Sequence, residues 1–362
     1  MYTWLEINLN KLEDNYNYIQ KQTNKKIIPI VKANAYGMGS IEISRFLKNR
    51  FNIDIFAVAN YNEALELYNN GVTSNILIFN EIESEFLKKS INKNFIFTIF
   101  NLFYLKKWIS YLKEDISKLK FHIKFNTGLN RLGLEIDDIP ELIELIKKYN
   151  LNIEGIYTHF ATADSDTNFM QKQINKFNEI ISILKKYNLN YKIKHLSNSP
   201  ASFNEININE NYVRIGMALY GLQPISNKTI NISSIFTWKA KIIDMRNIKK
   251  GEGVSYSQTI LNRDSKIGVV PIGYADGYMR QLSNKAYIMY KNKKCKIIGN
   301  VCMEKIIVDF TDTDAKIDDE VIILGDNIDI EELAKNSNTI ADDIISKFSK
   351  NIPRRYIYEK QS

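Results

Sequence analysis

A single lysine follows the apolar segment Ile27–Val31, and a tyrosine comes four positions after that lysine. Lys32 would lie where a buried strand ends, and burying an amine is costly unless it is paired or used covalently. An amine with a depressed pKa can form a Schiff base with an aldehyde. Tyr36, Gly37 and Gly39 would let a phenol and backbone N–H groups approach an anion such as a phosphate. The alternative is a lysine that only extends its ammonium from a strand end into solvent.

Polar residues follow other predicted strands in the same way, and each has an ordinary structural explanation when taken alone. The carboxyl ends of strands meet at one end of a parallel barrel, so we expect these residues to form one site. A hydroxyl and the N–H groups around a glycine after the last two strands would suit a phosphate. His122, in contrast, lies inside a predicted strand and is expected in the barrel wall. The residues at the common end are Arg131, His159, His195, Ser199, Arg214 and Gly216.

The first part of the chain alternates between strand and helix patterns. Residues 142–158 and 181–195 repeat one arrangement, an amphipathic helix, an Asn-containing stop and a short strand. Residues 62–70 also have helical spacing. Eight strands with intervening helices indicate a TIM-like (β/α)8 barrel. The predicted strands are Ile27–Val31, Ile55–Ala59, Ile76–Phe79, Phe95–Ile99, Phe121–Phe125, Ile153–Thr158, Tyr191–His195 and Tyr212–Ile215.

After residue 224 the pattern changes to short β-type segments without helices between them, which indicates a second, β-rich domain. We expect a barrel domain over residues 1–228 and a β domain over 229–362. Two short helices are predicted near the end, at Ile330–Asn336 and Ile340–Phe348. The predicted strands are Phe236–Ile243, Lys266–Pro271, Ala286–Tyr290, Lys296–Ile298, Ile306–Phe310 and Val321–Leu324.

Composition indicates a globular protein with large buried cores. The 362 residues are 44% hydrophobic and carry a net charge of +8. The basic residues are scattered among acidic ones on predicted helix faces, which disfavours a nucleic-acid surface. The N-terminus has no secretory pattern, and no apolar segment approaches a membrane span. Cys295 and Cys302 have no metal-ligand spacing. We therefore expect a reduced cytoplasmic protein without a structural metal.

Seven stretches resemble motifs of the alanine racemase family, in the order in which that family has them. The resemblance covers nearly the whole chain. It implies a pyridoxal-phosphate (PLP) enzyme with an N-terminal (β/α)8 barrel and a C-terminal β domain. It also implies head-to-tail homodimers that share two active sites. The stretches are Val31–Gly39, Arg131–Gly133, Thr158–Asp164, Val213–Gly221, Gly253–Tyr256, Val270–Tyr278 and Val301–Met303.

The resemblance assigns cofactor roles to residues of the barrel. Lys32 would hold PLP, and Arg214 would face the pyridine nitrogen. His159 and His195 would orient the catalytic tyrosine and that arginine. The phosphate contacts that it implies are Tyr36, Ser199, Gly216 and Met217.

The resemblance also implies substrate contacts and residues from a second subunit. Arg131 would lie near the phenolic oxygen of the cofactor and the carboxylate of the substrate. Tyr256 and the backbone of Met303 would come from the partner chain, and Tyr274 and Arg280 would line the entrance. The implied activity is the interconversion of L-alanine and D-alanine, which supplies D-alanine for bacterial peptidoglycan.

Physical chemistry supports two of these assignments. Racemisation removes the Cα proton on one face and returns a proton on the other, so two bases are needed, and Lys32 and Tyr256 are the available types. A free phenol has a pKa near 10, so Tyr256 needs nearby positive charge or hydrogen bonds. A permanently protonated Arg214 would keep the pyridine nitrogen unprotonated. The ring would then withdraw electrons more weakly, which disfavours transamination.

Five positions depart from the family pattern. Asn126, Ser257 and Glu304 stand where the family often has Asp, Gly and Asp. Asn300 stands where an entrance arginine is common, and Lys350 where some members have a phosphate-contacting tyrosine. The last two leave the entrance and one phosphate contact open.

Three other functions compete with this interpretation. A PLP-dependent decarboxylase of this fold would place a glutamate at the position of Arg214. A single-domain PLP carrier would need neither the β domain nor Tyr256. A racemase for serine or another small amino acid stays possible, since a hydroxymethyl needs little more space than a methyl.

Overall fold

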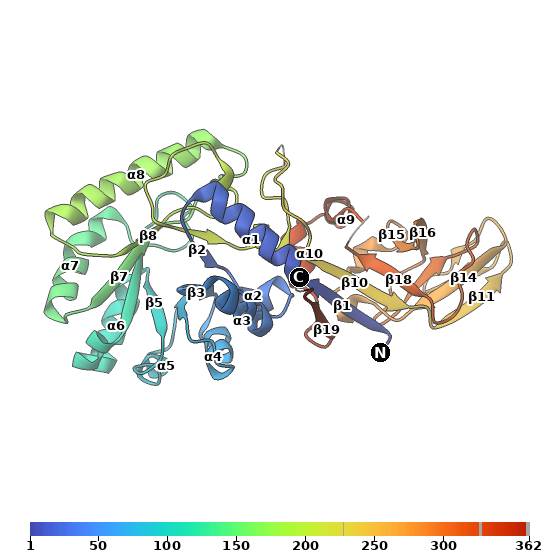
Figure 1. Cartoon of the computed structure of the whole chain (residues 1–362), viewed down its shortest axis with the longest axis horizontal. Coiled ribbons are helices and arrows are strands. Elements are labelled where there is room, and N and C mark those ends of the chain that lie inside the picture. The colour runs from blue at the N-terminus through green and yellow to red at the C-terminus, as the bar shows by residue number, and fades with distance from the viewer. Residues whose placement is uncertain (227, 326–327, 360–362) are drawn as a thin grey trace.

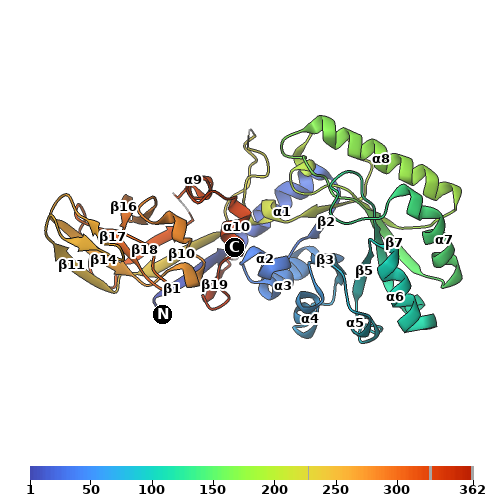
Figure 2. The ribbon, with the colours of Figure 1, turned by 180° about the vertical axis from the view of Figure 1, so that it is seen from behind.

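The computed structural model describes residues 1–226, 228–325 and 328–359. A barrel of strands and surrounding helices forms one part of the molecule, and a β-rich part lies beside it (Figure 1). Viewed from behind, the same two parts are separate except where α1, α10 and the strands near the termini join them (Figure 2).

The barrel contains all eight predicted strands. Strands β3 to β8 form a six-stranded parallel sheet in sequence order, and β2 pairs with β9. A parallel bridge between Ile30 and Ala57 connects β2 to β3. The N–H of Arg214 donates to the carbonyl of Ser197 at 3.0 Å, which connects β9 to the end of β8. The strands are β2 Lys26–Pro29, β3 Ile55–Val58, β4 Asn75–Ile78, β5 Phe95–Ile99, β6 Lys120–Lys124, β7 Asn152–Tyr157, β8 Ile193–His195 and β9 Tyr212–Ile215.

Helices surround the outside of the barrel strands (Figure 1). In α7, buried residues recur with helical spacing, so one apolar face packs toward the sheet. Several helices begin at an Asn or Asp whose side chain accepts a backbone N–H, as Asn60 does for α4. The helices of this part are α1 Leu9–Thr23, α2 Lys32–Tyr36, α3 Ser40–Phe51, α4 Tyr61–Asn69, α5 Ser84–Lys88, α6 Leu102–Leu112, α7 Ile139–Lys148 and α8 Thr167–Lys186.

Alternate residues of the barrel strands face different cores. Phe56 and Val58 belong to the large cluster between strands and helices, while Ile55 and Ala57 belong to a small inner cluster. Apolar side chains thus fill one part of the barrel interior. Buried polar side chains of β5 to β8 contact one another in the rest of it: Thr98 with Tyr157, and His122 with His195. The inner cluster is Ile28, Ile30, Ile55, Ala57, Leu77, Ile96 and Tyr212.

The β-rich part is built on a nine-stranded sheet, in the order β11-β14-β17-β16-β15-β18-β10-β1-β19. The prediction of a barrel followed by a β-rich part is confirmed. Its helices are α9 Ile330–Asn336 and α10 Ala341–Ser346, close to the predicted bounds. Its strands are β10 Phe236–Lys241, β11 Asp244–Ile248, β12 Gly253–Val254, β13 Thr259–Ile260, β14 Ser265–Val270, β15 Tyr287–Tyr290, β16 Lys293–Ile298, β17 Ile306–Asp309, β18 Glu320–Leu324 and β19 Arg354–Ile357.

The two ends of the chain meet in this sheet. Strand β1, Thr3–Asn8, pairs antiparallel with β10 and parallel with β19. The first residues of the predicted barrel domain therefore lie in the sheet of the β-rich part (Figure 1). The division into 1–228 and 229–362 stays a prediction. Among the described residues, no helix is both long and apolar enough to cross a membrane.

Candidate functional site

A cavity of about 660 Å³ opens at the carboxyl ends of the barrel strands. Every barrel residue that the sequence analysis predicted as a cofactor or substrate contact lines it. His195 lies behind the wall and reaches the cavity only through Arg214. The predicted residues in the lining are Lys32, Tyr36, Arg131, His159, Ser199, Arg214, Gly216 and Met217.

Lys32 begins a turn with an uncommon backbone. The four residues 33–36 all have φ between 50° and 56°, the left-handed region. The carboxylate of Glu63 accepts the N–H of Ala33 at 2.7 Å and the N–H of Ala59 at 2.8 Å, which ties the turn to the end of β3. On the other side, Arg354 donates from two nitrogens to the carbonyl of Gly37, at 2.9 and 3.1 Å. The position of Lys32 is thus fixed by residues distant in sequence.

The amine of Lys32 has the electrostatics of a nucleophile. Burial lowers its pKa from the ordinary value for lysine, and the nearby guanidinium of Arg131 lowers it further. The carboxylates of Asp342 and Glu63 act in the opposite direction. The net effect is a lowered pKa, which increases the fraction of neutral amine near pH 7.

Tyr36, Ser199 and Gly216 form a concave arrangement of hydrogen-bonding groups. A Cβ at Gly216 would lie 2.6 Å from the hydroxyl oxygen of Tyr36, so only glycine leaves that phenol its position. Burial raises the pKa of Tyr36, which therefore stays a neutral hydroxyl donor. The hydroxyl of Ser199 accepts the N–H of Gly216 at 3.2 Å and can donate its own proton. These neutral donors suit an anionic group such as a phosphate.

Arg214 is buried, with 3% of its surface exposed. Nη1 donates to the carbonyl of His195 at 2.7 Å, and Nη2 donates to the carbonyls of Leu196 and Thr158 at 2.8 and 2.9 Å. Nη2 also lies 3.3 Å from Nδ1 of His159. Burial lowers the pKa of Arg214 to about 10, so it stays charged near neutrality. Only its Nε–H has no partner among the described residues, and this group remains for a ligand in the cavity.

The contacts of Arg214 set the proton positions on three histidines. Because a guanidinium only donates, Nδ1 of His195, at 2.8 Å from Nη1, must accept. Nε2 of His195 then carries the proton and donates to Nδ1 of His122 at 3.0 Å. The proton of His122 is therefore on Nε2, which has no hydrogen-bond partner among the described residues. By the same reasoning His159 carries its proton on Nε2.

This histidine network predicts a pH-dependent stability. Burial, and then the charge of Arg214, lower the pKa of His122 to about 3 in the folded chain, against about 6.5 when unfolded. Between these values the unfolded chain binds more protons, so the free energy of unfolding falls as the pH falls below about 6.5. We expect His122→Asn, which can still accept from His195, to remove the contribution of His122 to this dependence. For each pH unit of acidification, the free energy of unfolding of the variant should rise relative to that of wild type by up to about 1.4 kcal/mol.

Urea unfolding of both proteins near neutral pH and near pH 5 measures this effect. Both proteins have the same carboxylates, so the contribution of these groups to the pH dependence cancels when the two proteins are compared. A stability difference that is constant with pH would contradict the assignment of His122 as a neutral buried histidine.

Lys124 and Asp342 are charged residues of the cavity lining that the sequence analysis missed. Lys124, the last residue of β6, is buried, and burial together with Arg131 lowers its pKa to about 8. Its place within a predicted strand ending at the site could have indicated it. Asp342, the second residue of α10, also lines the cavity. It comes from beyond the barrel, and no local pattern signals its location.

The residues expected from a second subunit do not line the cavity of their own chain. Tyr256 and Met303 are 70% and 56% exposed on the β-rich part. The amide of Asn300 donates to the carbonyl of Tyr256 at 2.9 Å. Lys350 also lies away from the cavity lining, with its ammonium 3.9 Å from Glu66. Tyr256 and Met303 are thus free of the described site and available to another chain.

Comparisons with known proteins agree with this geometry. Residues 7–224 match the family described as "Alanine racemase, N-terminal domain", and residues 235–356 match "Alanine racemase, C-terminal domain". An alanine racemase of Fusobacterium nucleatum is 37% identical, over 92% of this chain and 95% of that protein. Alanine racemase 2 of Caldanaerobacter subterraneus subsp. tengcongensis is 33% identical, over 98% and 95%.

The fold of this chain is also similar to solved structures of alanine racemases. The alanine racemase of Clostridium difficile 630 superimposes with a TM-score of 0.92 at 32% identity, covering 99% of this chain and 96% of that one. The alanine racemase of Bacillus anthracis with bound L-Ala-P superimposes with a TM-score of 0.93 at 29% identity and the same coverage.

Proposed function

Because this chain belongs to the alanine racemase family, we propose that it interconverts L-alanine and D-alanine with PLP held on Lys32, and with Lys32 and Tyr256 as the two bases. The observation that carries the proposal is the convergence in one cavity of a lysine of lowered pKa, a buried arginine with one free N–H, and a concave set of neutral donors.

The residues of the cavity fit PLP. Because Gly216 has no side chain, the hydroxyl of Tyr36 keeps a position from which it can donate to a phosphate, and Ser199 and the backbone at Met217 complete that end. The Nε–H of Arg214 is suited to the pyridine nitrogen, and Lys32 to the aldehyde carbon. When bound, PLP withdraws electrons from the attached amino acid and makes its Cα proton removable.

Two bases on opposite faces would exchange the proton. The neutral amine of Lys32 takes or returns a proton at Nζ on one face, aided by its lowered pKa. The phenol oxygen of Tyr256 does so on the other face. The Nε2–H of His159, fixed by the contact of Nδ1 with Arg214, can donate to that oxygen and favour its deprotonated form. Arg131 is suited to hold the carboxylate of the substrate.

Arg214 would select the reaction. Its charge is held by three backbone carbonyls, so it can donate a hydrogen bond to the pyridine nitrogen but has little tendency to give up a proton. Because Arg214 would keep its protons, a pyridine nitrogen held beside it would stay unprotonated, which would favour return of the proton to Cα over transamination.

A second chain would complete each site. Tyr256 and Met303 are exposed on the β-rich part and absent from the cavity of their own chain, which supports a dimer with shared active sites. We place the enzyme in the cytoplasm, where its D-alanine would serve peptidoglycan synthesis.

Covalent labelling tests the role of Lys32. Purified protein supplied with PLP should be yellow and racemise alanine, and borohydride should fix the cofactor to the peptide that contains Lys32. Lys124 lines the same cavity with a pKa of about 8, so it is the matched alternative. Lys124→Gln should still be labelled, and Lys32→Gln should not. Label on Lys124 in the wild-type protein would refute the assignment.

A further inference from the structure

The cavity wall contains a carboxylate beside the neutral donors. Asp342 comes from α10, near the end of the chain, and lines the same cavity as Tyr36, Ser199, Gly216 and Met217. It is partly buried, and burial raises its pKa above the ordinary value for aspartate. A carboxylate is an unusual neighbour for a place that otherwise suits an anion.

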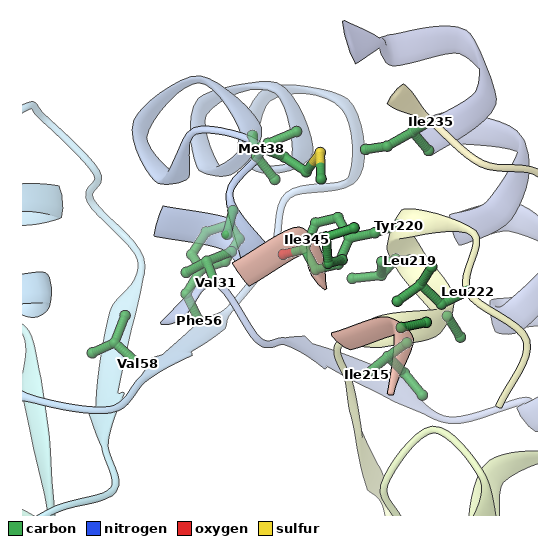
Figure 3. Packing of buried hydrophobic residues seen from close by; sticks show 14 of the residues in the cluster. Val31, Met38, Phe56, Val58, Ile215, Leu219, Tyr220, Leu222, Ile235 and Ile345 are labelled. Atoms are coloured by element: carbon green, nitrogen blue, oxygen red, sulfur yellow. The ribbon is translucent and has the colours of Figure 1, made fainter. Parts of the chain in front are cut away.

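The packing of α10 against the turn of Lys32 puts Asp342 there. Gly37 has no side chain to separate the turn from the backbone of Ile345 and the ring of Phe348. Ile345 lies in the buried cluster that includes Val31 and Tyr220 (Figure 3). One face of α10 is thus fixed in the core, and the residue at its second position borders the cavity.

The surroundings of Asp342 do not neutralise it. Its only described hydrogen bond is with its own backbone N–H, and it has no salt bridge among the described residues. The charged or titratable groups that interact with it are Lys32 and Tyr36 on α2 and Glu331 on α9. Arg354 on β19 is occupied by backbone carbonyls. The neighbouring Asp343, in contrast, binds Lys347 and Thr339 at 2.6 and 2.7 Å.

We propose, resting on the proposed function, that Asp342 opposes the phosphate group of PLP and limits the affinity of the chain for its cofactor. The donors that would hold the phosphate are neutral, and the carboxylate of Asp342 lines the same cavity and interacts with the hydroxyl of Tyr36. Like charges at close range repel, and a bound phosphate would favour the protonated form of Asp342. Cofactor binding would therefore be tighter when Asp342 is neutral.

Spectrophotometric titration with PLP tests this in three proteins: wild type, Asp342→Asn and Asp343→Asn. The first variant replaces the carboxylate by a neutral group of the same shape. The second removes the same charge from the same helix away from the cavity lining. Near pH 8 we expect Asp342→Asn to bind PLP about five- to tenfold more tightly than wild type, and Asp343→Asn to bind like wild type. The advantage of Asp342→Asn should shrink as the pH falls, because the pKa of the wild-type carboxyl is raised and the carboxyl then gains its proton.

Pyridoxal, which has the aldehyde but no phosphate, separates two effects. Loss of Asp342 also removes a charge that favours the ammonium form of Lys32, and this would strengthen binding of both aldehydes. The decisive quantity is the ratio of PLP affinity to pyridoxal affinity, which should rise only in Asp342→Asn. An unchanged ratio, with PLP bound to all three proteins, overturns the proposal for Asp342. Failure of every protein to bind PLP would instead refute the proposed function.

Discussion

A one-to-one mixture of Lys32→Ala and Tyr256→Phe chains should recover about a quarter of wild-type racemase activity, although each variant alone is nearly inactive. The reason is that Lys32 lines the cavity and Tyr256 is exposed on the β-rich part, outside it. If sites are shared, a mixed dimer has one site with both bases and one with neither. Random exchange makes about half of the dimers mixed, which gives the expected recovery.

Subunit exchange has to be shown independently, by mass spectrometry of chains that carry different tags. Removal of one general base is expected to cost about 10²- to 10⁴-fold in each parent homodimer, so the recovered activity is readily measured. Mixed dimers without recovered activity would mean that both bases come from one chain.

Replacement of Arg214 by glutamate should lower racemisation by on the order of a hundredfold or more and raise the ratio of transamination to racemisation. A protonated glutamate can give its proton to the pyridine nitrogen, which the guanidinium does not. The same change leaves the carbonyls of Thr158, His195 and Leu196 without donors, and each loss costs about 1–3 kcal/mol. Both products must therefore be measured at a temperature at which the variant is folded by circular dichroism.

Arg214→Lys is the matched control, because it keeps a positive charge while losing most of the donors. It should racemise more slowly than wild type without a higher transamination ratio. An equal rise in that ratio in both variants would show that disorder of the site, and not protonation of the ring, controls the reaction.

The sequence predicted the barrel well because its signals are local. Most of the eight strands are short apolar segments that alternate with helices, and Lys32 and Arg214 lie at or near the ends of such segments. Strand β1 was missed because its character comes from pairing with Phe236–Lys241 and Arg354–Ile357, far away in the chain.

The site was predictable from the sequence only where its residues lie at strand ends. Residues at strand ends could be placed together by barrel geometry alone. Asp342 could not, because only the packing of α10 against Gly37 brings it to the cavity. Lys124 is the last residue of β6, so its place at a strand end could have indicated it, but its lowered pKa comes from burial and from Arg131, which the sequence does not show.

The left-handed turn after Lys32 also has a consequence for synthesis of the protein. This conformation costs roughly 1–2 kcal/mol for each residue other than glycine, so the local sequence does not favour it. Arg354, which holds the carbonyl of Gly37, is 317 positions later in the sequence, and Tyr356 holds the carbonyl of Met38. A growing chain on the ribosome can form its barrel before these residues exist. The lysine turn is then completed only after Arg354 and Tyr356 have been synthesised, so a chain truncated before them would carry a barrel without a finished turn after Lys32.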